Sequence, residues 1–169
     1  MKPGRTFAIG DIHGCSTALK VLLATLDVQP GDTVITLGDH IDWGPDSKGV
    51  VDQLLDLDQK CRRISLLGNH ELMLMDAVRG ELSLSGWMMV GGDVTAASYG
   101  RCENWSDLPE RHRMFFETCQ PFYESETAIY VHANYAPNHP MSQQSSYDLL
   151  WRTLEELDVV PHYSGKPVY

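Results

Sequence analysis

Residues 7–14 read FAIGDIHG, a short apolar run that passes directly into glycine, aspartate and histidine. The apolar run over residues 7–9 is typical of a buried strand, and the polar residues stand where that strand ends. A helical pattern follows over residues 16–26, with a hydroxyl side chain at its start that can cap a helix. This stretch therefore predicts a strand, a loop that presents Asp11 and His13, and a helix.

The same succession of strand, polar loop and helix recurs twice more. Apolar runs over residues 33–37 and 64–67 predict strands, and helical patterns cover residues 50–57 and 71–78. Strands that alternate with helices in this way predict an α/β layered domain with a largely parallel first sheet. Farther on, the patterns predict a loop with a short helix over residues 87–99, a helix over 108–119, a strand over 127–131, a loop over 134–146 and a helix over 148–157.

Side chains of a restricted kind follow the predicted strands. Because ligands of open α/β sheets bind at the carboxyl ends of the strands, we expect these side chains to share one rim. Carboxylate, imidazole and amide oxygen groups suit manganese, iron or zinc. Any one of the motifs could be a turn or a helix cap, but four in succession predict a metal site. The residues concerned are Asp11 and His13, Asp39 and Asp42, Asn69 and His70, and His132.

With these motifs, the chain resembles the phosphoprotein-phosphatase branch of the calcineurin-like metallophosphoesterases. It looks most like small bacterial and phage-type Ser/Thr protein phosphatases, with diadenosine tetraphosphatases as cousins. The resemblance implies a single domain over residues 1–169, built as an α/β sandwich of two mixed β-sheets flanked by helices. The family signatures GDxHG, GDxVDRGP, GNHE and VHAG correspond here to Gly10–Gly14, Gly38–Pro45, Gly68–Glu71 and Val131–Asn134, and softer matches extend over nearly the whole chain.

The resemblance also implies a metal-binding role for each matching residue. Asp11 and His13 would hold a first metal ion, and Asn69 and His132 would bind a second. Asp39 would bridge the two ions. The implied cofactors are two divalent cations, with manganese preferred over iron, zinc or nickel.

The implied reaction is hydrolysis of a phosphomonoester by a hydroxide that bridges the two metals. His70 would be the general acid that protonates the leaving oxygen. Asp42 would orient it, because a carboxylate on the far nitrogen fixes the imidazole tautomer and raises its pKa. Arg152 would bind the phosphate through its planar fork, with Asn69 beside it. By resemblance the substrate is a protein phosphorylated on Ser, Thr or Tyr.

Trp43 departs from the family pattern, because it stands where the family usually has a phosphate-binding arginine. The loss of such a donor would slow the reaction, whereas an indole could stack on an aromatic or nucleobase leaving group. A surface tryptophan without a role is equally compatible with the sequence. Two other functions therefore stay open: a phosphoesterase of dinucleoside polyphosphates or small metabolites, and a catalytically weak phosphoprotein-binding module.

The second departure lies after residues 165–169, which read GKPVY, because the family motif Gly–His that should follow does not occur. We expect the last histidine of the second metal and the closing strands of the second sheet to be missing. Metal binding there should be weak or absent, since neither His139 nor His162 matches the family position. An exposed sheet edge near Val168 could then pair with a second chain.

Composition narrows the partners and the compartment. A formal net charge of −10 disfavours nucleic acid, whose phosphates need Lys and Arg. No apolar run approaches the roughly 20 residues of a membrane span, and the N-terminus lacks the apolar stretch of a signal peptide. Four cysteines far apart in the sequence indicate reduced thiols. We therefore expect a cytoplasmic protein that acts on a phosphoprotein or a phosphorylated small molecule, with no nucleic acid and no membrane.

Overall fold

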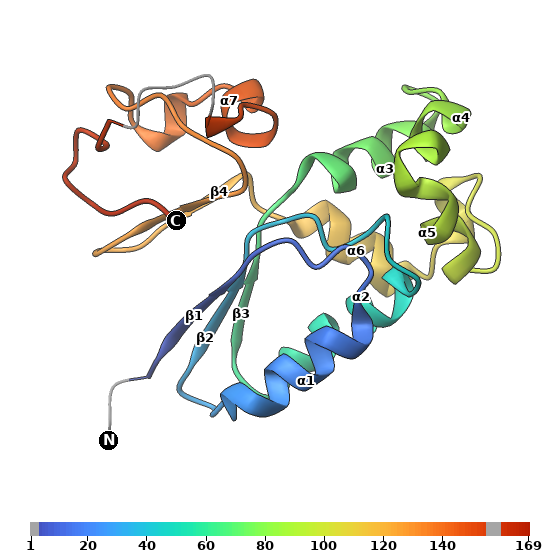
Figure 1. Cartoon of the computed structure of the whole chain (residues 1–169), viewed down its shortest axis with the longest axis horizontal. Coiled ribbons are helices and arrows are strands. Elements are labelled where there is room, and N and C mark those ends of the chain that lie inside the picture. The colour runs from blue at the N-terminus through green and yellow to red at the C-terminus, as the bar shows by residue number, and fades with distance from the viewer. Residues whose placement is uncertain (1–3, 155–159) are drawn as a thin grey trace.

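The computed structural model describes residues 4–154 and 160–169, and it places the strands in two sheets (Figure 1). The first sheet is parallel throughout, in the order β1-β2-β3, with Thr6 level with Thr33 and Thr33 level with Arg62. The second sheet pairs β4 with β5 in antiparallel fashion. The strands are β1 (Thr6–Ile9), β2 (Thr33–Thr36), β3 (Arg62–Ser65), β4 (Phe122–Glu124) and β5 (Ile129–Val131).

Each strand of the first sheet leads through a loop into a helix, as the sequence predicts. The second helix has a side-chain cap, because the Asp46 carboxylate accepts a hydrogen bond from the Gly49 N–H at 2.9 Å. The third begins where the Glu71 carboxylate accepts from the Gly68 N–H at 2.9 Å. The first two helices lie against each other beside the sheet (Figure 1). These helices are α1 (Ser16–Leu26), α2 (Ser47–Leu57) and α3 (Asn69–Arg79).

The first sheet is buried on both faces. Val34 of β2 packs into the main core with Leu19 and Leu54 from the helices. Its neighbour Ile35 points the other way and packs with Tyr130 of β5. Alternate residues of a strand face opposite sides of the sheet, and both of these valine and isoleucine side chains are fully buried. Helices therefore cover one face and the second sheet covers the other, so the predicted α/β fold is confirmed.

The segment over residues 87–99 is more helical than the sequence predicts. Its helices α4 (Leu84–Trp87) and α5 (Asp93–Ser98) are joined by a π-helical turn, η1 (Met88–Gly92), with a kink at Gly91, where φ is 94°. Only glycine adopts that backbone readily, so the Gly91–Gly92 pair marks a kink within a helical segment. The chain continues through η2 (Trp105–Asp107) into α6 (Glu110–Thr118), which agrees with the helix predicted over 108–119.

The prediction for the last fifth of the chain is partly wrong. After η3 (Met141–Gln143), α7 (Ser146–Leu150) ends well before the predicted limit at 157, and residues 155–159 lie outside the described part of the chain. The regular helical pattern ends where the Arg152 N–H donates to the Tyr147 carbonyl, five residues back instead of four. The short strand β4 has no clear pattern in the sequence and was not predicted.

The C-terminal residues extend the second sheet. Val168 forms a parallel bridge with Ile129, and the Val131 N–H donates to the Tyr169 carbonyl at 2.9 Å. Antiparallel and parallel pairing thus occur together, so the second sheet is mixed while the first, among the described strands, is not. Pairing of this edge with another chain stays a prediction. None of the helices in the described ranges is both long and apolar enough to cross a bilayer.

Candidate metal centre

The loops after β1 and β2 form one rigid rim at the carboxyl ends of the strands. The N–H groups of Ile12 and His13 both donate to the Asp39 carbonyl at 2.9 Å, which ties the two loops together. His13 and Asp39 have positive φ angles of 44° and 47°. Side chains with a β-carbon rarely adopt this backbone, and such strained positions cluster at functional sites. The rim therefore has the local conformation expected of a ligand-binding edge.

Asp39 lies at the centre of the predicted ligands. Its Oδ2 atom is 3.6 Å from Nε2 of His13 and 4.0 Å from Nε2 of His70, and its Oδ1 atom is 3.5 Å from Nε2 of His132. Asp11 joins from the more exposed side, with its Oδ1 atom 4.0 Å from Nδ1 of His132. Two groups result, one of His13, Asp39 and His70 and one of Asp11, Asp39 and His132, and within each the ligand atoms lie within 4.8 Å of one another.

The grouping differs in one respect from the prediction. The resemblance implies that Asp11 shares an ion with His13, whereas in the structure Asp11 groups with Asp39 and His132. The two arrangements are compatible, because Oδ2 of Asp11 also lies 4.0 Å from Nε2 of His13. Asp39 belongs to both groups, in keeping with the bridging position expected for it.

Backbone carbonyls fix the orientation of the two candidate metal-binding imidazoles. Nδ1 of His13 lies 2.9 Å from the Ile41 carbonyl, and Nδ1 of His132 lies 2.9 Å from the Leu37 carbonyl. A carbonyl can only accept, so each Nδ1 carries a proton and each Nε2 can present a lone pair toward Asp39. In that tautomer Nε2 of His132 also faces Oδ1 of Asn69 at 3.0 Å. These lone pairs converge as ligands of a divalent cation do, so the residues fit such an ion.

His70 is held from behind by Asp42. Its Nδ1 atom lies 2.8 Å from Oδ2 of Asp42, whose carboxylate is fully buried. Burial by itself lowers the pKa of His70, but the hydrogen bond to Asp42 and the charges of Asp39 and Asp42 outweigh it, so this pKa lies above its usual value. Nε2 then faces the rim and can carry a proton.

Two further residues complete the surroundings of Asp42, and sequence reasoning missed both. The indole N–H of Trp87 donates to Oδ2 at 2.9 Å, and the Thr95 hydroxyl donates to Oδ1 at 2.7 Å. Trp87 is fully buried, and a buried indole N–H needs an acceptor, but nothing in the sequence indicates which one.

Glu71 joins the second and third loops beneath the site. Its fully buried carboxylate accepts from the N–H groups of Asp39 and His40 at 2.8 Å and from that of Gly68 at 2.9 Å. Burial raises the pKa of Glu71, yet the adjacent His40 and the backbone donors lower it further, to about 2. His40 is fully buried, with Nδ1 3.2 Å from this carboxylate. Glu71 thus fixes the backbone that presents Asp39.

The structure does not bring Arg152 to the centre. Its Nη1 atom donates to Asp148 at 2.7 Å, and no contact among the described residues joins it to the predicted ligands, so its phosphate-binding role stays a prediction. His162 is also engaged elsewhere, with Nε2 3.0 Å from the His139 carbonyl. Among the described residues, neither His139 nor His162 belongs to the two groups of candidate ligands.

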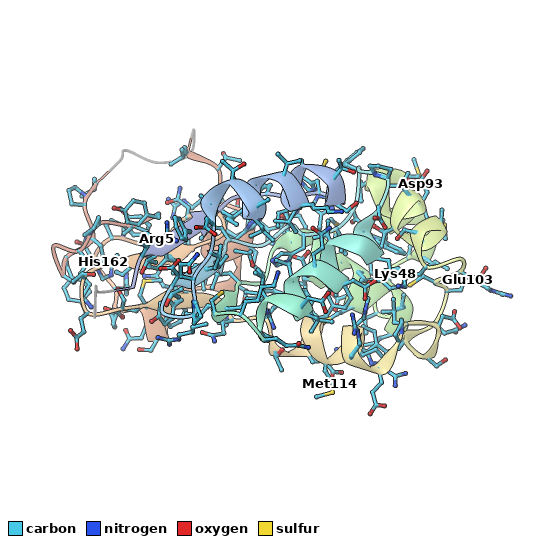
Figure 2. The ribbon with its side chains drawn as sticks, turned by 90° about the horizontal axis from the view of Figure 1, so that it is seen from below. Arg5, Lys48, Asp93, Glu103, Met114 and His162 are labelled. Carbon is cyan, nitrogen blue, oxygen red and sulfur yellow. The ribbon has the colours of Figure 1, made fainter. Side chains whose placement is uncertain are left out.

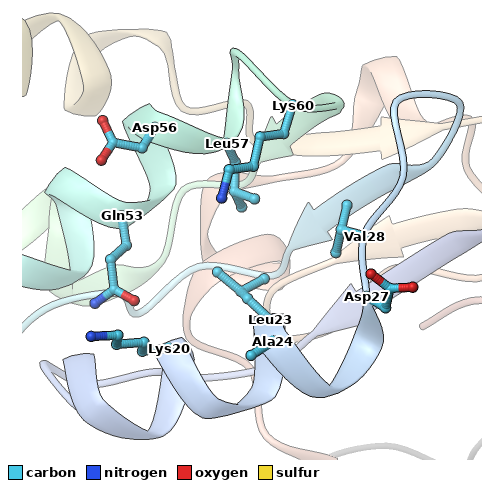
Figure 3. Close-up of a pocket in the computed structure, with 9 residues that line it drawn as sticks. All are labelled: Lys20, Leu23, Ala24, Asp27, Val28, Gln53, Asp56, Leu57 and Lys60. Carbon is cyan, nitrogen blue, oxygen red and sulfur yellow. The ribbon is translucent and has the colours of Figure 1, made fainter.

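A hollow of about 610 Å³ lies away from the rim, between α1 and α2 (Figure 3). Asp27 follows the end of α1 and Lys60 follows the end of α2, and both helices start near the rim and run away from it. The hollow therefore opens at the opposite end of the sheet and plays no part in the candidate centre.

Comparison with known proteins agrees with this geometry. Residues 4–165 match the family described as calcineurin-like phosphoesterase. A symmetrical bis(5'-nucleosyl)-tetraphosphatase of Paracidovorax citrulli is 33% identical over 136 residues, which cover 78% of this chain and 45% of that protein. Serine/threonine-protein phosphatase 1 of Salmonella typhimurium is 33% identical over 154 residues, covering 86% and 67%. A protein serine/threonine phosphatase structure from Saccharomyces cerevisiae shares the fold, with a TM-score of 0.65 at 17% identity over 99% of this chain and 55% of its own.

Proposed function

Because the chain belongs to the calcineurin-like phosphoesterase family, we propose that it is a metal-dependent hydrolase of phosphate monoesters that acts on proteins phosphorylated on Ser, Thr or Tyr. The observation that carries this proposal is the convergence of three imidazole nitrogens on the buried carboxylate of Asp39, within 4.0 Å. The chain spans less than half the length of its Paracidovorax relative. The proposal therefore rests on the side chains of this chain and not on the activity of the longer protein.

The proposed cofactors are two divalent cations, with manganese as the preferred metal. Asp11, His13, Asp39, Asn69 and His132 would hold them. Such ions, when bound, supply Lewis acidity toward phosphate oxygens and lower the pKa of water. Burial raises the pKa of Asp39, so a cation beside it would favour the ionised form that the site needs.

The contribution of the protein to the chemical step is the placement of one proton. Asp42 holds Nδ1 of His70, so Nε2 points to the rim where a phosphate ester would lie. The raised pKa increases the fraction of His70 that is protonated near neutral pH, and Nε2 can then donate its proton to the departing oxygen. Asp42 acts through His70 and is a positioning residue.

The decisive experiment measures hydrolysis of a phosphoserine peptide by the purified chain, stripped of metal and then supplied with Mn²⁺. We expect turnover only with metal, and a loss of about 10²–10⁴-fold in His70→Asn, which keeps a similar size and polarity. Circular dichroism should show that the variant folds. A folded, metal-loaded chain that binds the peptide without turnover would instead identify a binding module.

A dinucleoside polyphosphate is the second candidate substrate. The name of the Paracidovorax relative and the exposed Trp43 beside His70 support it. Rates on diadenosine tetraphosphate and on the phosphopeptide, compared at equal concentrations, separate the two substrates.

A further inference from the structure

Trp43 is an exposed aromatic side chain on a rigid piece of backbone. It and the preceding Asp42 have positive φ angles of 63° and 70°, a conformation that bulky residues seldom adopt. The Asp42 N–H donates to the Thr95 hydroxyl at 2.9 Å and the Gly44 N–H returns to the Asp42 carbonyl at 2.7 Å, so the backbone is fixed on both sides of the indole. The side chain nevertheless remains 59% exposed.

One side of the indole rests on Gly91. The Trp43 N–H donates to the Gly91 carbonyl at 3.2 Å, and a β-carbon on Gly91 would lie only 2.7 Å from Cδ2 of the indole. The kink at Gly91 therefore leaves room for this ring. Val90 and Met89, which precede Gly91 in the chain, are also exposed apolar residues, at 36% and 84%.

The indole also stands at the rim of the candidate centre. Its ring centroid lies 6.3 Å from that of His70, with the ring planes 65° apart. His70 is the proposed donor to the leaving oxygen, so the group that departs must pass close to both rings. An aromatic ring carried by the departing group would find an exposed indole beside His70.

We propose that Trp43 is a specificity-determining side chain that stacks on a planar aromatic group carried by the leaving side of the substrate. This inference rests on the proposed function, because it takes His70 as the group beside the departing oxygen. Two sources share the required chemistry: the phenyl ring of a phosphotyrosine and the base of a nucleotide. An aliphatic phosphoserine offers no ring to stack.

The test compares kcat/KM of the wild type, Trp43→Ala and Trp43→Phe on three substrates under one metal condition. These are a phosphotyrosine peptide, the same peptide with phosphoserine, and diadenosine tetraphosphate. Base–aromatic stacking predicts a loss of about five- to hundredfold in Trp43→Ala on the aromatic substrate and little change on phosphoserine. Trp43→Phe should restore most of the loss. The aromatic substrate that suffers the loss identifies which ring is bound.

The control is Met114→Ala, a truncation of an apolar side chain that is 57% exposed on α6 and points outward from the helix (Figure 2). It should leave all three rates unchanged. Equal rates in Trp43→Ala and wild type, or an equal loss on all three substrates, would overturn the stacking role while leaving the phosphoesterase function in place. If the wild type hydrolyses none of the three with metal present, the proposed function fails first and this inference fails with it.

Discussion

Nδ1 of His70 lies 2.8 Å from Oδ2 of Asp42, and this contact connects the rim to the buried core. The Asp42 carboxylate accepts two other side-chain hydrogen bonds, from Trp87 and Thr95, so it has little freedom to rotate. The imidazole therefore has one fixed tautomer and one fixed direction. Both follow from side-chain contacts within this chain, so each contact can be tested by substitution of one residue.

Asp42→Asn should lower kcat by about 10²–10⁴-fold and also change the pH profile. Asp42 raises the pKa of His70, so its loss lowers that pKa, and the general acid then loses its proton at a lower pH. The alkaline limb of the kcat profile should shift to lower pH. A fall in rate with an unmoved alkaline limb would mean that Asp42 has only a structural role.

Trp87→Phe should destabilise the protein and reduce activity less than loss of His70 does. The change keeps an aromatic ring in the core but leaves Oδ2 of Asp42 with one donor fewer, which costs about 1–3 kcal/mol in the free energy of unfolding. Urea denaturation measures this cost. Trp105→Phe is the matched control, since Trp105 is only half-buried and has Arg79 over its ring. Equal stability of the two variants would contradict a role for the indole N–H.

Glu71→Gln should lower the melting temperature strongly. A glutamine can present one oxygen and an NH₂ group to three backbone N–H donors, so at least one buried donor loses its partner, at a cost of about 1–3 kcal/mol or more. The same change at the surface, Glu117→Gln, removes only an exposed ion pair with Arg79 and should cost less than about 1 kcal/mol. A similar melting temperature for both variants would show that Glu71 does not hold the loops.

The succession of strands and the rim they form could be predicted because both depend on local patterns. An apolar run that ends in Gly–Asp fixes where a strand stops, and the parallel pairing of β1 and β2 then brings Asp11 and Asp39 to the same edge. His132 reaches the same place from β5 of the second sheet. These features need no knowledge of distant contacts.

The surroundings of Asp42 could not be predicted, because they depend on contacts between segments far apart in the sequence. Trp87 and Thr95 reach it across 45 and 53 residues of sequence, through a kinked helical segment whose Gly91–Gly92 pair is more typical of a loop. β4 has only three residues, too few for an alternating apolar pattern, and it forms a strand because it pairs with β5. α7 ends at a backbone turn that propensity does not reveal.

Trp43→Arg should raise kcat/KM on a phosphoserine peptide by about tenfold or more. A guanidinium at this exposed rim position would face the charge that develops on the phosphate, and one such donor is typically worth about 10²–10³ in rate. Any preference for an aromatic substrate should fall in the same variant. No gain on any substrate would show that the absent arginine does not limit this chain.

Mn²⁺ should raise the melting temperature of the wild type and have no such effect on Asp39→Asn. A ligand that binds only the folded state stabilises it by about 2.7 kcal/mol at a hundredfold excess over its Kd. Asp39 contributes to both groups of candidate ligands, so its conversion to an amide weakens both at once, whereas Asp58→Asn on the surface should respond like the wild type. Titration calorimetry of the same three proteins counts the ions. A full shift in Asp39→Asn would place the metals elsewhere, and with them the proposed chemistry.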